Sequence, residues 1–192
     1  MSSSPCWEIV ELRAVDKLLN KFIHVRKLTQ NDLMNSEIKE LKIVHSNKPT
    51  TNFWIAGHRN INDGWELFNP QVGKFKSCIA PKGLSWIKGI TNNLIIAESV
   101  IDVISAKKLN NIEADLLSLN STTMAKRAGE AILKRNYSYE KIILALDNDK
   151  SGEEAKNTLL SYLKNMGTIE VMKYPSNGKD PSSELMSRTF SF

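Results

Sequence analysis

The second half of the chain alternates short apolar runs with segments of helical periodicity, and this alternation constrains the fold more than any other feature. The runs at 94–98 and 141–147 are almost entirely apolar, as in strands whose two faces are both buried. The segments between them have the length of crossover helices, which bring successive strands into parallel pairing. The pattern therefore predicts an α/β domain with a parallel sheet flanked by helices. The runs are residues 94–98, 114–120, 141–147 and 168–175, and the helical segments are 100–109, 122–135 and 152–166.

The segment before this domain has a different character. Residues 48–90 carry aromatic and β-branched side chains in short stretches. An Asn-Asp-Gly sequence at 62–64 and an Asn-Pro sequence at 69–70 separate these stretches, as turns do. This segment is predicted to form a small β-rich subdomain with an antiparallel meander.

The first 47 residues are predicted to be helical. Their apolar residues recur every three or four positions, the spacing of one helix face, and Thr29 precedes the second series as an N-cap would. We expect packing helices here, with a helical docking arm for a partner as the alternative. The expected domains are thus 1–47, 48–90 and 91–192, and the apolar positions are Ile9, Leu12, Val15, Leu18, Leu19 and Phe22, then Leu33, Ile38, Leu41 and Val44.

Composition narrows the class of protein. The 192 residues are 41% hydrophobic, enough for a substantial core, and the net charge of +5 is compatible with a polyanionic partner. No apolar run is long enough to span a membrane and no secretory signal is apparent, so we expect a cytoplasmic protein without membrane contact. Cys6 and Cys78 are too few for a disulfide framework or a cysteine zinc site, and the histidines are far apart, so no zinc is expected.

Acidic residues stand where the apolar runs end. Glu98 closes the first run and Asp180 follows the last. Asp147 and Asp149 close the third. Because ligands of open α/β sheets bind at the carboxyl ends of the strands, these acids are expected to meet at one edge and to raise one another's pKa. Carboxylates are the hard oxygen ligands that Mg²⁺ prefers, so the sequence predicts a divalent-metal site for phosphate chemistry.

Simpler interpretations exist for the individual acids. Asp147 and Asp149 alone also fit a loop followed by a helix N-cap, since Asp favours both. Asp102 lies one helical turn after Glu98 and is either a further acid of the site or a solvated residue at the start of a helix. Four acids at successive strand ends favour the metal site over the loop.

Three ordered motifs resemble the Toprim domain, which DnaG-type primases share with topoisomerases and certain nucleases and recombination proteins. AESVID (97–102) resembles its strand-ending Glu motif, ALDNDKSGEEA (145–155) its Asp-x-Asp motif and GKDPSSEL (178–185) its Lys-Asp-Pro motif. GHRNINDGWELFNPQVGKFK (57–76) is similar to the basic segment that precedes Toprim in primases, particularly in small plasmid and phage proteins. The resemblance covers residues 52–187.

This resemblance implies a DNA primase-like nucleotidyltransferase that makes RNA primers on single-stranded DNA in replication. Glu98, Asp147 and Asp149 would be catalytic, and together with Asp180 they would bind Mg²⁺ or Mn²⁺. The implied partners are single-stranded DNA and ribonucleoside triphosphates, with a replicative helicase as a further candidate. The residues implied to contact nucleic acid or nucleotide are Arg59, Asn69, Lys74, Lys76, Lys82 and Lys179.

The sequence also departs from the family. Ser99 stands where Toprim proteins usually have Gly after the Glu, and SLNSTT (118–123) lacks the Gly usual after the second strand. Complete primases of this type carry a zinc-binding module and a helicase or helicase-contacting domain, and neither is expected within this sequence. Two alternatives therefore stay open. One is a Toprim nuclease that uses the same acids, and the other is a non-catalytic accessory protein that binds nucleic acid or a helicase.

Overall fold

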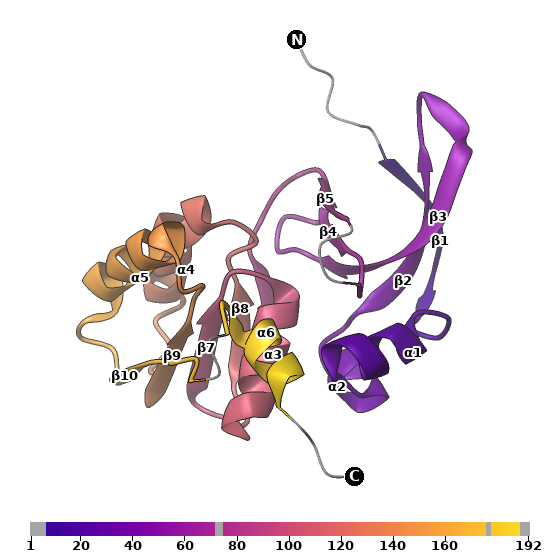
Figure 1. Ribbon diagram of the computed structural model, residues 1–192. Coiled ribbons are helices and arrows are strands. Elements are labelled where there is room, and N and C mark those ends of the chain that lie inside the picture. Colours follow the sequence, from indigo (N-terminus) through magenta and orange to yellow (C-terminus); the bar gives the residue numbers. More distant parts are fainter. Residues whose placement is uncertain (1–6, 72–74, 176–177, 189–192) are drawn as a thin grey trace. The chain divides into compact units, whose positions relative to one another are not determined.

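The computed structural model describes residues 7–71, 75–175 and 178–188 (Figure 1). The chain divides into two compact units, Met1–Gly83 and Leu84–Phe192, and each has its own five-stranded sheet. In the described part of the chain, no helix is both long and apolar enough to cross a membrane.

The N-terminal unit is built on an antiparallel sheet whose strands follow the chain order from β1 to β5. Short helical turns connect β1 to β2, and Thr29 caps the last of them through a capping box with Asp32, the N-cap role expected for it. The strands are β1 (Trp7–Ala14), β2 (Lys39–His45), β3 (Lys48–Arg59), β4 (Trp65–Phe68) and β5 (Lys76–Ile79), and the turns are α1 (Leu19–Lys21), a π-helical turn (Phe22–Arg26) and α2 (Gln30–Met34).

The prediction of helices across residues 1–47 is wrong for residues 7–14 and 39–45, which form β1 and β2. In β2, Leu41 and Ile43 are fully buried and Lys42 between them is partly exposed, which is the two-residue period of a strand. The physical reason is tertiary: β2 pairs with β1 on one side and β3 on the other, so its backbone and apolar face are both satisfied in the sheet. The predicted boundary at residue 47 therefore falls inside one sheet.

The C-terminal unit is the predicted α/β domain. Its strand order is β10-β9-β7-β8-β6, with parallel pairing except between β6 and β8. The strands are β6 (Ser85–Ile87), β7 (Asn93–Ala97), β8 (Asp115–Ser118), β9 (Lys141–Ala145) and β10 (Thr168–Val171), and the helices are α3 (Val100–Asn110), α4 (Ala125–Arg135), α5 (Lys150–Leu163) and α6 (Pro181–Ser187).

Helices cover both faces of this sheet. α3 and α6 lie together on one side, and α4 and α5 lie together on the other (Figure 1). Leu94, Ile96 and Leu144 belong to the core that α4 and α5 close. Ile95 and Ile143, which alternate with them along the strands, are also buried. Burial of both faces explains why the apolar runs are nearly unbroken.

The boundary between the units differs from the predicted one. β3, β4 and β5 form the antiparallel meander expected within residues 48–90. β6, which the same prediction included, instead pairs with β8 in the C-terminal unit. Trp86 of β6 packs against the core of that unit, and the guanidinium of Arg135 lies 3.6 Å from the centre of its ring. The units therefore separate after Gly83 and not at residue 90.

Replacing Leu41 with Ala is expected to lower the free energy of unfolding by about 2–4 kcal/mol, because it empties a fully buried position. Leu12, its register partner on β1, is 50% exposed, so Leu12→Ala is expected to cost less than about 1 kcal/mol. Urea unfolding followed by circular dichroism measures both losses. Equal losses would favour the helical prediction, in which each of the two residues lies on the apolar face of its own helix.

Candidate metal centre

Two neighbouring parallel strands, β7 and β9, position Glu98 and Asp147. β7 and β9 pair in register, with Ala97 beside Ala145 at their carboxyl ends. Glu98 follows β7 directly, and Asp147 lies two residues after the end of β9. The backbone N–H of Asp147 donates to Oε1 of Glu98 over 3.4 Å. Glu98 and Asp147 therefore lie side by side at one edge of the sheet.

The turn from β9 into α5 depends on a glycine. A Cβ on Gly152 would come within 2.1 Å of the carbonyl oxygen of Asp147. Only a residue without a side chain lets the first turn of α5 approach the strand end this closely. This close approach explains the glycine that follows Asp149 by three residues in the motif.

The Asp147 carboxylate is surrounded by other acids. Burial, and then the negative charges of Asp102 and Glu98, raise its pKa from the ordinary 3.8 to about 7. Its Oδ1 is buried and has no hydrogen-bond partner among the described residues. Such an atom is rare in folded proteins and calls for a proton or a cation. The expectation that the acids raise one another's pKa is confirmed for Asp147.

Asp102 belongs to this group of acids. It is 8% exposed, in the first turn of α3, and its charge is the first among those that raise the pKa of Asp147. Its Oδ1 accepts a hydrogen bond from the N–H of Ser182 in α6 at 3.3 Å. Its Oδ2 accepts one from the hydroxyl of Ser99, which also caps α3. The structure therefore excludes the solvated alternative, and Ser99 in place of the usual glycine holds this carboxylate.

The pKa of Asp149 is shifted in the opposite direction from that of Asp147. Its Oδ1 accepts hydrogen bonds from the N–H of Gly152 and the hydroxyl of Ser151, both at 3.0 Å. These bonds lower its pKa, so the expectation of a raised pKa is wrong for this residue. Asp149 is the N-cap of α5, which confirms the loop-and-cap interpretation for it.

The Lys-Asp-Pro motif lies against the Asp-x-Asp motif. Asp180 caps α6 through a capping box with Ser183. The ammonium of Lys179 is 3.6 Å from Oδ2 of Asp149. The carbonyl oxygen of Lys179 accepts a hydrogen bond from the N–H of Asn148 at 2.7 Å. Residues 30 positions apart in the chain thus share one edge of the sheet.

The loop after β8 turns at Asn120, since the glycine that Toprim proteins usually have there is absent. Asn120 has a φ of 60°, in the left-handed region that Asn tolerates better than most residues. Its side chain donates to the hydroxyl of Ser85 at 2.9 Å and accepts from the hydroxyl of Ser118 at 2.6 Å. The loop therefore turns at the edge of the site without glycine.

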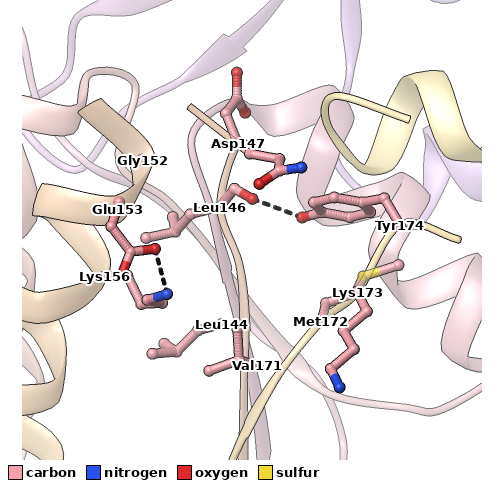
Figure 2. Close-up of a pocket in the computed structure, with 11 residues that line it drawn as sticks. Leu144, Leu146, Asp147, Gly152, Glu153, Lys156, Val171, Met172, Lys173 and Tyr174 are labelled. Atoms are coloured by element: carbon pink, nitrogen blue, oxygen red, sulfur yellow. Dashed lines mark hydrogen bonds and ion pairs between the residues drawn. The ribbon is translucent and has the colours of Figure 1, made fainter. Parts of the chain in front are cut away.

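Tyr174 is a residue of the site that sequence reasoning missed. Its hydroxyl donates to the carbonyl oxygen of Leu146 over 2.7 Å, directly before Asp147 (Figure 2). Burial and the charges of Asp102 and Asp147 raise its pKa. The ring lines a pocket of about 360 Å³ between β9, α5 and the chain after β10, and Figure 2 shows the Asp147 carboxylate projecting away from the other lining side chains. A tyrosine at the end of the last apolar run was the available signal.

These donors suit a hard cation. The unpartnered Oδ1 of Asp147 lies among carboxylates, the ligands that Mg²⁺ and Mn²⁺ take. The residues that would hold such an ion are Glu98, Asp147, Asp149 and Asp180. Across residues 7–71, 75–175 and 178–188, however, no three acidic, histidine or cysteine side chains are already spaced as ligands of one metal. The carboxylates would therefore have to close around the ion.

Of the predicted basic contact residues, Arg59, Lys76 and Lys82 lie in the N-terminal unit, but not all on one face. Arg59 ends β3 and is exposed, with an ion pair inside its own turn. Lys76 and Lys82 are exposed and both act to lower the pKa of Glu66, against the effect of its burial. Because His58, not Arg59, pairs beside Glu66, strand alternation places Arg59 on the other face. Their contact with nucleic acid stays a prediction.

Two further residues of this unit, Asn69 and His58, have surroundings that favour a structural role. Asn69 lies in the turn after β4, where its Oδ1 accepts a hydrogen bond from the N–H of Gln71 at 2.8 Å. His58 is 2% exposed, and burial lowers its pKa to about 4, so its ring is neutral at pH 7. Neither ring nitrogen has a hydrogen-bond partner among the described residues. Lys74 lies outside the described residues.

Comparison with known proteins identifies the C-terminal unit. A family model described as Toprim-like matches residues 95–185, the span that contains all five acids discussed above. This unit carries a Toprim domain. The Toprim prediction is thereby confirmed for the part of the chain that holds the candidate site.

Solved phage primases share the fold. The crystal structure of the primase fragment of the bacteriophage T7 primase-helicase protein has a TM-score of 0.61 and 18% identity, covering 82% of this chain and 65% of that one. Primase domains of T7, determined with its lagging-strand DNA polymerase, an RNA/DNA hybrid and dTTP, have a TM-score of 0.59 and 18% identity, covering 81% and 79%. The chain thus spans less than two thirds of the first fragment. A comparison with curated proteins gives no match.

Replacing Asp147 with Asn is expected to raise the free energy of unfolding near pH 8 in EDTA by about 1–3 kcal/mol. The unfolded chain loses this proton near pH 3.8, whereas the folded Toprim domain keeps it up to about pH 7. Wild-type stability therefore falls as the pH rises through this window, and the gain from Asn is expected to vanish near pH 4. Urea unfolding at both pH values measures it.

Asp149→Ala is the control of opposite sign. It removes the side-chain cap on the N–H of Gly152 and is expected to destabilise the protein near pH 8. An Asp147→Asn protein less stable than wild type under the same conditions would contradict the description of Asp147 as a carboxylate destabilised by its neighbours.

Proposed function

We propose that the chain is the catalytic core of a primase-type nucleotidyltransferase, which joins ribonucleotides on single-stranded DNA with Mg²⁺ or Mn²⁺. The observation that carries the proposal is the buried Asp147 carboxylate, whose Oδ1 lacks a hydrogen-bond partner in the described part of the chain and lies among other acids. It belongs to a Toprim domain whose fold matches that of a phage primase fragment. Phosphoryl transfer needs such carboxylates, because they hold the cation that neutralises phosphate charge.

In this proposal the acids have different roles, which follow from their surroundings. Asp147, Asp149 and Asp180 would hold the cation, which would neutralise charge on the phosphate oxygens of the incoming ribonucleoside triphosphate. Glu98 lies beside Asp147, where it either adds a ligand or accepts the proton of the primer 3′-hydroxyl. The 3′-oxygen bonds to the α-phosphorus and pyrophosphate leaves with the electron pair of the broken P–O bond.

The N-terminal unit is proposed to bind the nucleic acid. Arg59, Lys76 and Lys82 are exposed cations, which bind phosphates without reading sequence. Binding to single-stranded DNA is therefore expected to be weak and to fall steeply with salt. A replicative helicase is a further proposed partner, because the T7 fragment comes from a primase-helicase protein.

The test is primer synthesis on single-stranded DNA with labelled ribonucleotides and Mg²⁺ or Mn²⁺, with and without the helicase of the same replicon. Wild type is expected to make short RNA products, and Asp147→Asn is expected to lose at least about 100-fold in rate, since it removes a cation ligand. Glu130→Gln is the matched control. It neutralises an exposed acid on α4 that pairs with Lys126, and it is expected to retain activity.

Two outcomes would overturn the proposal in favour of the alternatives. Cleavage of end-labelled DNA by wild type but not by Asp147→Asn, without primers, would identify a Toprim nuclease. Binding to DNA or helicase with neither product, unchanged in Asp147→Asn, would identify an accessory protein.

A further inference from the structure

One ion pair in the Toprim domain joins a lysine to an acid of the candidate site. The Nζ of Lys179 lies 3.6 Å from Oδ2 of Asp149. The other carboxylate oxygen, Oδ1, already caps α5 by accepting from the N–H of Gly152. Oδ2 is therefore the oxygen with which Asp149 could hold a cation while keeping its cap, and the ammonium of Lys179 stands beside it.

The backbone of Lys179 is fixed, but its side chain is free to move. Its carbonyl oxygen accepts from the N–H of Asn148 at 2.7 Å, and its own N–H donates to the hydroxyl of Ser183 at 2.9 Å. The side chain is 64% exposed. A flexible four-carbon stem on a fixed base lets the ammonium leave Asp149 without disturbing the loop.

We propose that Lys179 is an internal counter-ion that a divalent cation displaces from Asp149, after which its ammonium contacts the phosphates of the incoming nucleotide. The inference rests on the proposed function, because it concerns the same site. An exposed ion pair of this kind contributes no more than about 1 kcal/mol, so displacement costs little. Until the cation arrives, the lysine offsets part of the repulsion among the acids. Once released, it stays at the rim of the site, where cation-bound phosphates bring negative charge.

A neighbouring lysine provides the matched control. Lys150 follows Asp149 directly and is 92% exposed, but its ammonium is directed to Glu154, at 4.0 Å, in the next turn of α5. Removing its charge changes the net charge near the site by the same amount as removing that of Lys179. Any difference between the two variants therefore reports the contact with Asp149 and not the general electrostatic field.

The experiment measures cation and nucleotide binding separately in wild type, Lys179→Met and Lys150→Met. In Lys179→Met, the Mg²⁺ concentration that gives half of the rise in Tm without nucleotide is expected to fall about two- to fivefold, since the competing ion pair is gone. At saturating Mg²⁺, the Kd for ATP is expected to rise at least about fivefold, because a charge-assisted phosphate contact is lost. Lys150→Met is expected to change each value less than about twofold.

The opposite signs of the two effects separate ion exchange from a structural role, because a disturbed loop weakens both kinds of binding. Weaker Mg²⁺ binding by Lys179→Met, or ATP binding equal to that of wild type, would overturn this inference and leave the proposed function standing. A wild-type Tm that responds to neither Mg²⁺ nor Mn²⁺ would overturn the metal site itself, and the proposed function with it.

Discussion

A carboxylate buried among carboxylates is the interaction on which the site depends. Asp147 cannot ionise at low cost, because burial and the charges of Asp102 and Glu98 oppose it. The group must therefore carry a proton or face a cation, and its unpartnered Oδ1 leaves room for either role. The parallel pairing of β7 and β9 imposes this enclosure, because it brings Glu98 and Asp147 to the same edge.

The fold also offsets part of the repulsion that it creates. Three helices begin at the edge where the acids lie, and each has an acid at its first turn or cap: Asp102 on α3, Asp149 on α5 and Asp180 on α6. The partial positive charge of a helix N-terminus favours a carboxylate there. Lys179 adds a full positive charge beside Asp149. Asp147 follows the end of β9 and caps no helix, so no helix N-terminus offsets the repulsion that the other acids exert on it.

The Toprim domain could be predicted from the sequence because its signals are local and strong. Strands buried on both faces leave unbroken apolar runs, and acids that end such runs must meet at one edge. β1 and β2 could not be predicted in the same way, because their structure depends on the pairing of β1 with β2 and of β2 with β3. The apolar residues around Leu12 and around Leu41 recur at spacings that also fit a helix. The roles of Asp102 and Tyr174 depend on contacts with α6 and with the Leu146 carbonyl, 80 and 28 residues away in the chain.

The central claim is that the Asp147 carboxylate is a cation site. The most direct measurement is anomalous diffraction from crystals of the wild-type protein soaked in Mn²⁺, with the data collected at the manganese edge. An anomalous peak within ligand distance, about 2.2 Å, of Oδ1 of Asp147 and of at least one other carboxylate of the edge is the predicted result. A saturated crystal with no peak at this edge, or with Mn²⁺ bound only elsewhere, would contradict the claim.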